Sequence, residues 1–571
     1  MQLAAFAFDY DGTLAHDGRV ADATVEALRR LKAAGLRLLL LTGRELPHLQ
    51  EVFPRYDLFD AIVAENGGLL SRPALHEERL LGAPPPAELL AALYRRRVEP
   101  ISVGRSIIAT WEPNDAAALE AIRESGVEWQ IVFNKGAVMC LPPGVNKASG
   151  LRAALDALEL SPLNVCGVGD AENDHAMLAA CGYRAAVANA IPALRAEADF
   201  VTQARNGAGV VELIERFLAQ PAGLTGSVRR HDVLLGCDAR GERVFLPPGS
   251  LVYVSGASGS GKSRLTTLLI ERMLAHGLQL CVVDPEGEYE RLPELVALGD
   301  AQSAPSLEEA TRLLQRPQHS VALNLLGIAL EERPRYLARV MKLAEDLRVR
   351  SGRPHWLVID EAHHAMPREA HPLLESAARG LPGTLLVSAS PRAVDPEVLA
   401  AVQIVITVGE QASAILAEYC QAAQLAAPPA VPRTRRDEAI CWNRTRSEVQ
   451  VIALDTPRTE HQRHIRKYAQ GTLGADKSFH FRGPHQALNL RAQNLSVFLQ
   501  LAAGVDDETW LFHLQRGDYA RWFREAINDA ELADDAGGIE RELGTDAAAS
   551  RAAIRELVNR RYTAPAGAQS P

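Results

Sequence analysis

The sequence has few of the features that mark secreted, membrane-spanning or nucleic-acid-coated proteins. Its 7 cysteines lie far apart without a Cys-x-x-Cys pair, which argues against a disulfide framework or zinc site and favours a reducing cytoplasm. No apolar run approaches the roughly 18 residues of a membrane-spanning helix. Acidic residues outnumber basic ones by 71 to 61. This balance disfavours a general nucleic-acid coat, although a local basic groove remains compatible with it. We therefore expect a cytoplasmic protein without a membrane partner.

With 571 residues, of which 47% are hydrophobic and 23% charged, the chain has the size and composition of a soluble protein with several domains. Changes in the predicted pattern of strands and helices, together with a stretch that contains Pro and Gly, suggest the domain boundaries. We expect a first domain over 1–216, a linker over 217–228, a second domain over 229–455, a helical region over 456–562 and a disordered tail over 563–571.

The first domain opens with an apolar strand that ends in two carboxylates, Asp9 and Asp11. Side chains at i and i+2 of a strand point to the same face, so the two acids should leave the sheet side by side. Gly12 permits a sharp turn after them. Two like charges this close favour a bound cation between them. The pair suits a nucleophile, an acid/base and Mg²⁺, whereas the alternative is an ordinary surface turn.

Three later stretches place polar groups at the same predicted sheet edge, because the carboxyl ends of parallel strands meet there. Thr42 and Gly43 follow the strand over 36–41, and the Thr42 hydroxyl suits either a phosphoryl oxygen or a helix N-cap. Lys147 opens a helix over 148–158, an unfavourable place for a cation unless it faces a phosphate or solvent. Asp170 and Asp174 follow a further strand and suit a metal ion, with Asn173 supporting their loop.

A different pattern interrupts this alternation and predicts a small α+β insertion over the sheet edge, at about 71–141. Its expected elements are a helix over 87–97, a strand over 102–111, a helix over 115–125, and strands over 127–133 and 136–141.

The stretches DYDGTL, LTGR, Lys147 and GDAEND together resemble the haloacid dehalogenase (HAD) superfamily of phosphatases, in its Cof-type branch with a type II cap. The resemblance implies that Asp9 attacks phosphorus and that Asp11 is the acid and base. Thr42 and Lys147 would hold the phosphoryl group of a small phosphorylated substrate chosen by the cap, with Glu65 and Asn66 as candidate substrate contacts. It further implies Mg²⁺ held by Asp9, the Asp11 carbonyl oxygen, Asp170 and Asp174.

The second domain contains a phosphate-binding loop between a predicted strand and helix. Its residues Gly256, Ser258, Gly259, Ser260, Gly261, Lys262 and Ser263 fit the Gly-x-x-x-x-Gly-Lys-Ser pattern. Backbone N–H groups of such a loop surround the ATP phosphates. Lys262 would reach the β- and γ-phosphates, and the Ser263 hydroxyl would ligate Mg²⁺. ATP is thus the expected ligand.

Asp360 and Glu361 close another strand of this domain and suit a Mg²⁺ contact and the polarisation of an attacking water, which favours hydrolysis over phosphoryl transfer. GASGSGKS, VVDPEGEY and LVIDEAHH resemble the HerA/FtsK group of P-loop ATPases, many of them ring motors on DNA. The resemblance implies a homo-oligomer with an arginine finger from a neighbour. Ser388 and Ser390 stand where that group usually has a glutamine. Candidate fingers are Arg392, Arg433, Arg435 and Arg436.

The C-terminal region alternates basic and aromatic residues over 461–485. This pattern suits single-stranded nucleic acid or another phosphorylated partner, or else a solvated face. Amphipathic helices are expected over 489–504 and 507–533. Their large apolar residues should form a core: Trp510, Phe512, Leu514, Trp522 and Phe523.

The predicted fold class is α/β: a HAD-type parallel sheet with a small α+β cap, then a P-loop α/β domain and a small helical region. The predicted function is Mg²⁺-dependent hydrolysis of a sugar phosphate or similar metabolite, with ATP hydrolysis in the second domain. Two alternatives are a nucleic-acid end-processing phosphatase with a DNA-associated ATPase motor, and an ATP-gated regulatory protein.

Overall fold

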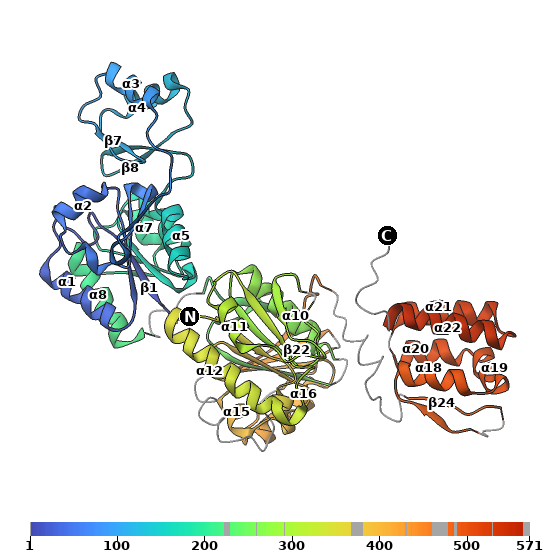
Figure 1. Ribbon diagram of the computed structural model, residues 1–571. Coiled ribbons are helices and arrows are strands. Elements are labelled where there is room, and N and C mark those ends of the chain that lie inside the picture. The colour runs from blue at the N-terminus through green and yellow to red at the C-terminus, as the bar shows by residue number, and fades with distance from the viewer. Residues whose placement is uncertain are drawn as a thin grey trace. The chain divides into compact units, whose positions relative to one another are not determined.

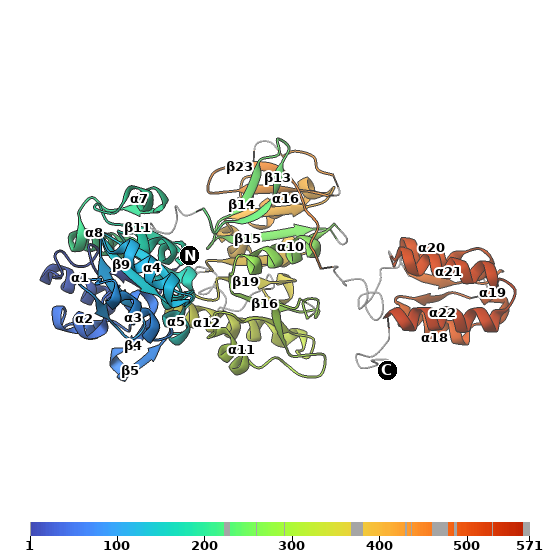
Figure 2. The same cartoon turned by 90° about the horizontal axis from the view of Figure 1, so that it is seen from above.

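The computed structural model divides the chain into two compact units, Met1–Pro457 and Arg458–Pro571 (Figures 1 and 2). The predicted tail, residues 222–228 of the predicted linker, Ser258, Gly259, Arg436 and most of the basic stretch lie outside the described residues. The described residues are 2–221, 229–257, 260–290, 292–366, 381–428, 431–435, 437–459, 478–484, 488–527 and 529–562.

The first domain is built on an eight-stranded sheet in which β1 (Ala5–Asp9) lies between β10 and β2, parallel to both. The sheet is parallel from β12 to β3, and β4 and β5 add antiparallel strands. The other strands in spatial order are β12 (Phe200–Val201), β11 (Tyr183–Ala186), β10 (Val165–Gly169), β2 (Arg37–Leu41), β3 (Ala61–Ala64), β4 (Leu69–Arg72) and β5 (Glu77–Leu80).

Side chains along β1 alternate between the two faces of the sheet, and each face packs against a different set of helices. Phe6 and Phe8 join the core beneath α1 and α8, whereas Ala5 and Ala7 join the core beneath α5 and α6. Asp9 continues the series of Ala5 and Ala7, so it shares the α5 side of the sheet. The first-domain helices are α1 (Asp22–Ala33), α2 (Leu46–Val52), α5 (Lys147–Ala157), α6 (His175–Ala180), α7 (Pro192–Glu197) and α8 (Asn206–Ala219). The predicted parallel α/β fold is confirmed.

The cap is a separate four-stranded antiparallel sheet with two helices (Figure 1). It begins after β5, because residues 71, 72 and 77–80, which the sequence pattern places in the cap, pair in the main sheet. The predicted strand over 102–111 is two strands, since the chain turns between them at residues that bind Glu65. The cap elements are α3 (Ala87–Arg95), β6 (Ser102–Val103), β7 (Ile108–Trp111), α4 (Asp115–Ser125), β8 (Gln130–Asn134) and β9 (Ala137–Leu141).

The second domain has an eleven-stranded sheet in which β20 (Thr384–Ser388) separates the phosphate-loop strand β15 (Leu251–Gly256) from β19 (Trp356–Ile359). The remaining strands are β13 (Val233–Asp238), β14 (Arg243–Leu246), β16 (Leu280–Asp284), β17 (Leu295–Leu298), β18 (Ser320–Asn324), β21 (Ile404–Val408), β22 (Glu438–Asn443) and β23 (Glu448–Ala453). Its helices are α10 (Lys262–Ala275), α11 (Leu307–Leu314), α12 (Arg333–Ser351), α13 (Ala362–Ala365), α15 (Pro396–Ala401) and α16 (Ala412–Ala422).

The two α/β domains are joined by hydrogen bonds at the starts of β10 and β19. Asn164 Nδ2 donates to the Gln2 carbonyl oxygen at 2.7 Å and to that of Gly352 at 3.3 Å, and Asn164 Oδ1 lies 2.9 Å from His355 Nε2. Burial lowers the pKa of His355 to about 3. Its Nδ1 accepts from the Gln279 N–H at 2.7 Å. The neutral ring therefore donates from Nε2 to Asn164, and the first two domains form one unit.

Replacing Asn164 by alanine should lower the free energy of unfolding by about 1–3 kcal/mol, because buried partners lose their hydrogen bonds. Urea unfolding followed by circular dichroism measures this loss. The exposed Gln318→Ala removes an amide of similar chemistry and should change stability by less than about 0.5 kcal/mol. Equal stability of the two variants would contradict the role of Asn164.

The C-terminal unit is a helical module with a short hairpin, and its aromatic core contains Trp510, Leu514, Trp522 and Phe523 as predicted. Phe512 is only half-buried. The predicted helix over 489–504 begins later, because residues 490–492 pair with β24, and the one over 507–533 is broken into three helices. The elements are β24 (Phe479–Phe481), β25 (Leu490–Ala492), α18 (Leu495–Gly504), α19 (Asp507–Gln515), α20 (Asp518–Glu525), α21 (Ala530–Glu542) and α22 (Ala547–Tyr562). Throughout the described chain, no helix has the length and hydrophobicity needed to cross a bilayer.

Candidate active site

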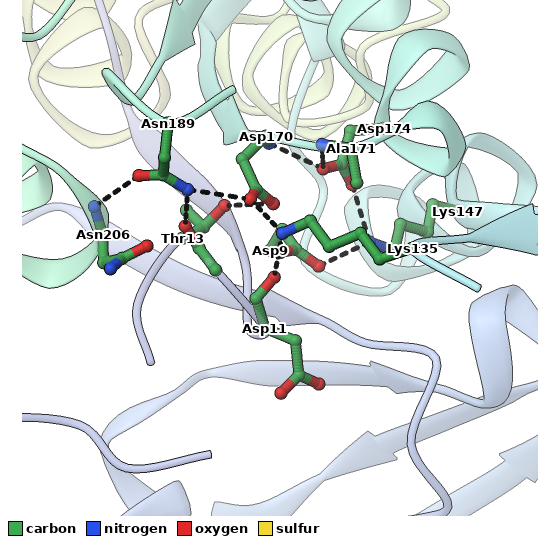
Figure 3. Close-up of polar contacts among 11 residues, drawn as sticks. Asp9, Asp11, Thr13, Lys135, Lys147, Asp170, Ala171, Asp174, Asn189 and Asn206 are labelled. Atoms are coloured by element: carbon green, nitrogen blue, oxygen red, sulfur yellow. Dashed lines mark hydrogen bonds and ion pairs between the residues drawn. The ribbon is translucent and has the colours of Figure 1, made fainter. Parts of the chain in front are cut away.

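A buried lysine joins two of the predicted acids. Asp9 ends β1, and Lys147 begins α5 on the same side of the sheet. Lys147 Nζ donates to Asp9 Oδ1 at 2.5 Å and to Asp174 Oδ1 at 2.6 Å, and all three residues are almost fully buried (Figure 3). Burial alone would lower the Lys147 pKa, but Asp174 and Asp9 outweigh it and raise the pKa above its ordinary value. Lys147 therefore stays protonated and can neutralise a phosphoryl group.

The acids form a cluster suited to a hard cation. Oxygen atoms of Asp9, Asp170 and Asp174 all lie within 4.8 Å of one another. Asp9 Oδ2 is buried without a hydrogen-bond partner. Burial, reinforced by the charge of Asp174, raises the Asp9 pKa well above its usual range. Carboxylate oxygens are the ligands that Mg²⁺ prefers, so a divalent cation here fits the donor set and would favour the ionised form of Asp9.

Asp174 also fixes the loop that carries the cluster. Its Oδ2 accepts from the backbone N–H groups of Asp170 and Ala171, at 2.9 and 3.0 Å. Asn173 Nδ2 donates to Asn66 Oδ1 at 2.9 Å, which connects this loop to the turn after β3. Asn173 therefore contacts the turn after β3, and its supporting role stays a prediction.

Asp11 lies differently from the side-by-side arrangement that an extended strand would give. The strand ends at Asp9, and Gly12 has a φ of 86° in the turn that follows. The Asp11 carboxylate binds Arg44 through two hydrogen bonds, from Nε at 2.8 Å and from Nη2 at 2.7 Å. It is partly exposed and points away from the metal-type cluster (Figure 3). Its carboxylate is therefore not part of the cluster, whereas its backbone carbonyl oxygen lies 3.4 Å from Lys135 Nζ, which also pairs with Asp170.

Thr42 and Gly43 lie beside Asp9 at the end of β2. Thr42 is fully buried, and its hydroxyl oxygen accepts from the Arg44 N–H at 3.1 Å. A Cβ on Gly43 would lie 3.2 Å from the sulfur of Met139 on β9. The cap therefore rests directly on this loop.

Three contacts to the acids come from residues that sequence reasoning missed. Thr13 Oγ1 donates to Asp170 Oδ1 at 3.3 Å, and Asn189 Nδ2 donates to Asp170 Oδ2 at 3.0 Å and to the Gly12 carbonyl oxygen at 2.8 Å. Lys135, at the tip of the β8–β9 hairpin, forms an ion pair with Asp170 Oδ2. Thr13 was within reach of inference because it belongs to DYDGTL. Asn189 and Lys135 lie outside the four motifs.

Glu65, a candidate substrate contact, is engaged by the cap backbone. Its carboxylate accepts from the N–H groups of Arg105 at 3.1 Å and Ser106 at 2.6 Å. Burial raises its pKa. Glu65 therefore holds the cap loop, and its contact with substrate stays a prediction.

The second predicted site lies at the carboxyl ends of β15 and β19. Gly261 has a φ of 103° just before α10 begins at Lys262. Lys262 Nζ donates to the carbonyl oxygens of Gly256 at 2.6 Å and Ala257 at 3.1 Å, and Ser263 is buried in the first turn. Lys262 thus lies across the loop that would surround phosphates.

The acids at the end of β19 are both buried. Asp360 Oδ2 accepts from the Tyr289 hydroxyl at 2.9 Å, and Asp360 Oδ1 accepts from the Glu361 N–H at 2.9 Å. Glu361 has a φ of 41°, and its Oε2 lies 3.3 Å from His363 Nδ1. His363 Nδ1 lies 3.2 Å from Ser388 Oγ. The polar end of β20 is therefore linked to Glu361 through a histidine.

The first domain is a capped domain with a largely parallel α/β sheet, and acidic residues at its strand ends surround a buried lysine. A family model described as haloacid dehalogenase-like hydrolase matches residues 6–84 and 115–214. Phosphoglycolate phosphatases of Methanothermobacter thermautotrophicus and Haloarcula marismortui are 36% and 31% identical over 224 and 214 residues. These matches cover 38% and 36% of this chain, and 99% and 93% of the relatives. The chain belongs to the haloacid dehalogenase-like hydrolase family, and its first domain is a phosphatase domain of that type.

A second family model, described as the central domain of helicase HerA, matches residues 252–346. The chain thus joins a phosphatase domain to a HerA-like domain. Among solved structures, a protein of Thermoplasma acidophilum is similar at 19% identity and a TM-score of 0.34, covering 38% of this chain and 99% of that one. A haloacid dehalogenase-like hydrolase of Bacteroides thetaiotaomicron matches at 20% identity and 0.33, covering 38% and 100%.

Proposed function

We propose that the first domain hydrolyses small phosphomonoesters with Mg²⁺ through a covalent intermediate on Asp9. The observation that carries this proposal is the environment of the two carboxylate oxygens of Asp9. One oxygen is fixed by Lys147 at 2.5 Å, and the other is buried among carboxylates without a hydrogen-bond donor. Such an oxygen is costly to bury unless a cation or an electrophile meets it. Bound Mg²⁺ would supply charge neutralisation at Asp9, Asp170, Asp174 and the Asp11 carbonyl oxygen.

The chain's own residues can perform both halves of the reaction. Asp9 attacks phosphorus as the ester oxygen leaves, and Asp11 protonates that oxygen. Asp11 then removes a proton from water, which attacks phosphorus and releases phosphate together with the free Asp9 carboxylate. Lys147 and Thr42 hold the phosphoryl oxygens, and Arg44 orients the Asp11 carboxylate.

The substrate we favour is a small phosphorylated carboxylic acid such as 2-phosphoglycolate. The named relatives, phosphoglycolate phosphatases, support this choice. The cap sets a size limit, because cap residues contact the loop after β2 and the acids themselves. Sugar phosphates are the second candidate. A 3′-phosphorylated nucleic-acid end is bulkier and suits this capped site less well.

Removal of divalent cations should abolish phosphate release, because three clustered carboxylates would then repel the substrate's phosphoryl group. Purified protein treated with EDTA should turn over 2-phosphoglycolate at least about 100-fold more slowly. Added Mg²⁺ should restore the rate. A panel containing 2-phosphoglycolate, sugar phosphates and 3′-phosphorylated oligonucleotides ranks the substrates. Full activity in EDTA would contradict the proposed metal role.

The second domain, in this proposal, binds and hydrolyses ATP. Support comes from the match to the HerA central domain and from the placement of Lys262, Ser263, Asp360 and Glu361 at one sheet edge. Self-assembly through this domain and contact with nucleic acid extend the proposal. Sedimentation with and without ATP tests the first, and stimulation of ATP turnover by DNA tests the second. Dependence of the phosphatase rate on ATP would favour the regulatory alternative.

A further inference from the structure

The β8–β9 hairpin presents a lysine in an unfavourable backbone conformation. Asn134 pairs with Ala137, so Lys135 and Gly136 alone form the turn. Their φ angles are 49° and 85°. Two-residue turns with positive φ at both positions favour Asn-Gly, and the left-handed conformation is unfavourable for lysine. A strained residue that carries a charge into an active site indicates a functional role for that charge.

The Lys135 ammonium group reaches two groups that also suit a divalent cation. It pairs with Asp170 Oδ2 and lies 3.4 Å from the Asp11 carbonyl oxygen (Figure 3). It comes from the cap, whereas both acceptors belong to the phosphatase sheet. Lys135 therefore neutralises Asp170 in the way that a bound cation would, and its side chain is still 44% exposed.

The other two cations described at the site pair with acids other than Asp170. Lys147 lies between Asp9 and Asp174, and Arg44 binds the Asp11 carboxylate, which points away from the cluster. A divalent cation on Asp170 would repel the nearby Lys135 ammonium group. Lys135 would then leave Asp170 and pair with another anion. Because Lys135 lies on the cap and faces the site where substrate binds, that anion can belong to the substrate.

We propose that Lys135 determines substrate specificity by binding a second anionic group, a carboxylate close to the phosphate ester, once Mg²⁺ occupies Asp170. This inference rests on the proposed phosphatase function. The phosphoryl group is held by core residues at the strand ends, so the cap lysine meets the remainder of the substrate. Because the hairpin tip reaches the acids themselves, the carboxylate must be only a few bonds from phosphorus. Without Mg²⁺, Lys135 returns to Asp170.

The variant K135N removes the charge while supplying a residue that this turn prefers, so it should fold at least as well as the wild type. Calorimetric titration with Mg²⁺ in the absence of substrate should show about 3-fold or tighter binding by K135N, because a competing cation is gone. Its kcat/KM for 2-phosphoglycolate should fall about 10- to 100-fold, the usual value of a charge-assisted hydrogen bond. For ethyl phosphate, which has no carboxylate, kcat/KM should change less than about 2-fold.

Arg95→Gln is the matched control, since it removes a cap cation whose partner is Glu124 on the cap helix α4. It should leave Mg²⁺ affinity and both kcat/KM values unchanged. Equal loss on both substrates, or unchanged Mg²⁺ affinity in K135N, would overturn the proposal for Lys135. Absence of wild-type activity on both substrates would instead refute the proposed phosphatase function.

Discussion

Asp9→Asn should abolish phosphomonoester hydrolysis, with a loss of about 10⁴-fold or more in kcat. The side chains have nearly the same shape, but an amide cannot form the phosphoryl bond that a carboxylate forms. Asp9 is the proposed nucleophile, so this substitution acts directly on the bond-forming step. Lys147 fixes one oxygen at 2.5 Å, and burial among acids raises the pKa of the group. Replacement by a neutral amide removes the nucleophile and also one anionic partner of a buried ammonium group.

Steady-state hydrolysis of an aryl phosphate measures this loss, and it avoids dependence on the natural substrate. Asp17→Asn is the control, because Asp17 is exposed in the same connection after β1 and has a φ of 49°, a conformation that asparagine tolerates. It should retain wild-type activity. Thermal unfolding of both variants separates loss of chemistry from loss of fold. Activity of D9N within tenfold of the wild type would exclude Asp9 as the nucleophile.

Lys262→Ala should eliminate ATP hydrolysis and weaken ATP binding, with an expected loss of about 100-fold or more in turnover. Lys262 is buried at the start of α10, and its ammonium group lies against the carbonyl oxygens of Gly256 and Ala257. Phosphates bound by the loop would take that ammonium group as their main cationic contact. Alanine leaves the helix intact but removes this charge.

The measurement should be made in the D9N background, so that any phosphate released from ATP comes from the second domain. Lys342→Ala on α12 is the control, because its side chain is 65% exposed and pairs with acids of its own helix. It should hydrolyse ATP at the rate of its parent. In an otherwise wild-type chain, K262A should keep its activity on 2-phosphoglycolate. Unchanged ATP turnover in K262A would refute the nucleotide site.

The strand-end motifs were predictable because their geometry is local. An apolar strand followed by Asp9, and another followed by Asp170, defines a sheet edge once the strands are parallel. The period-two rule did not extend to Asp11, which was expected beside Asp9, because the strand ends at Asp9. Local periodicity was insufficient where pairing with a neighbouring strand decides the outcome. Residues 71, 72 and 77–80 joined the main sheet, and 490–492 formed a strand, because adjacent strands pair with their backbones.

Lys135 and Asn189 show the same limit within the site. Lys135 lies on a cap hairpin and Asn189 lies on a loop after β11. Both are distant in sequence from Asp170, which they contact in the folded protein. The only local signal at Lys135 was a lysine before glycine between two short strands. A hairpin turn fixes the direction in which that lysine points, but only the position of the cap over the sheet gives it Asp170 as a partner.

The amino-acid order alone determined which chemical groups leave the ends of the strands, since backbone alternation and turns follow from neighbours in the chain. Tertiary structure decided how the charges are balanced. In the folded protein Asp11 pairs with Arg44, and Asp9 and Asp174 pair with Lys147. Asp170 pairs with a lysine from the cap. Electrostatic energy in a buried site depends on distances between residues that only folding brings together, so no local pattern could supply these pairings.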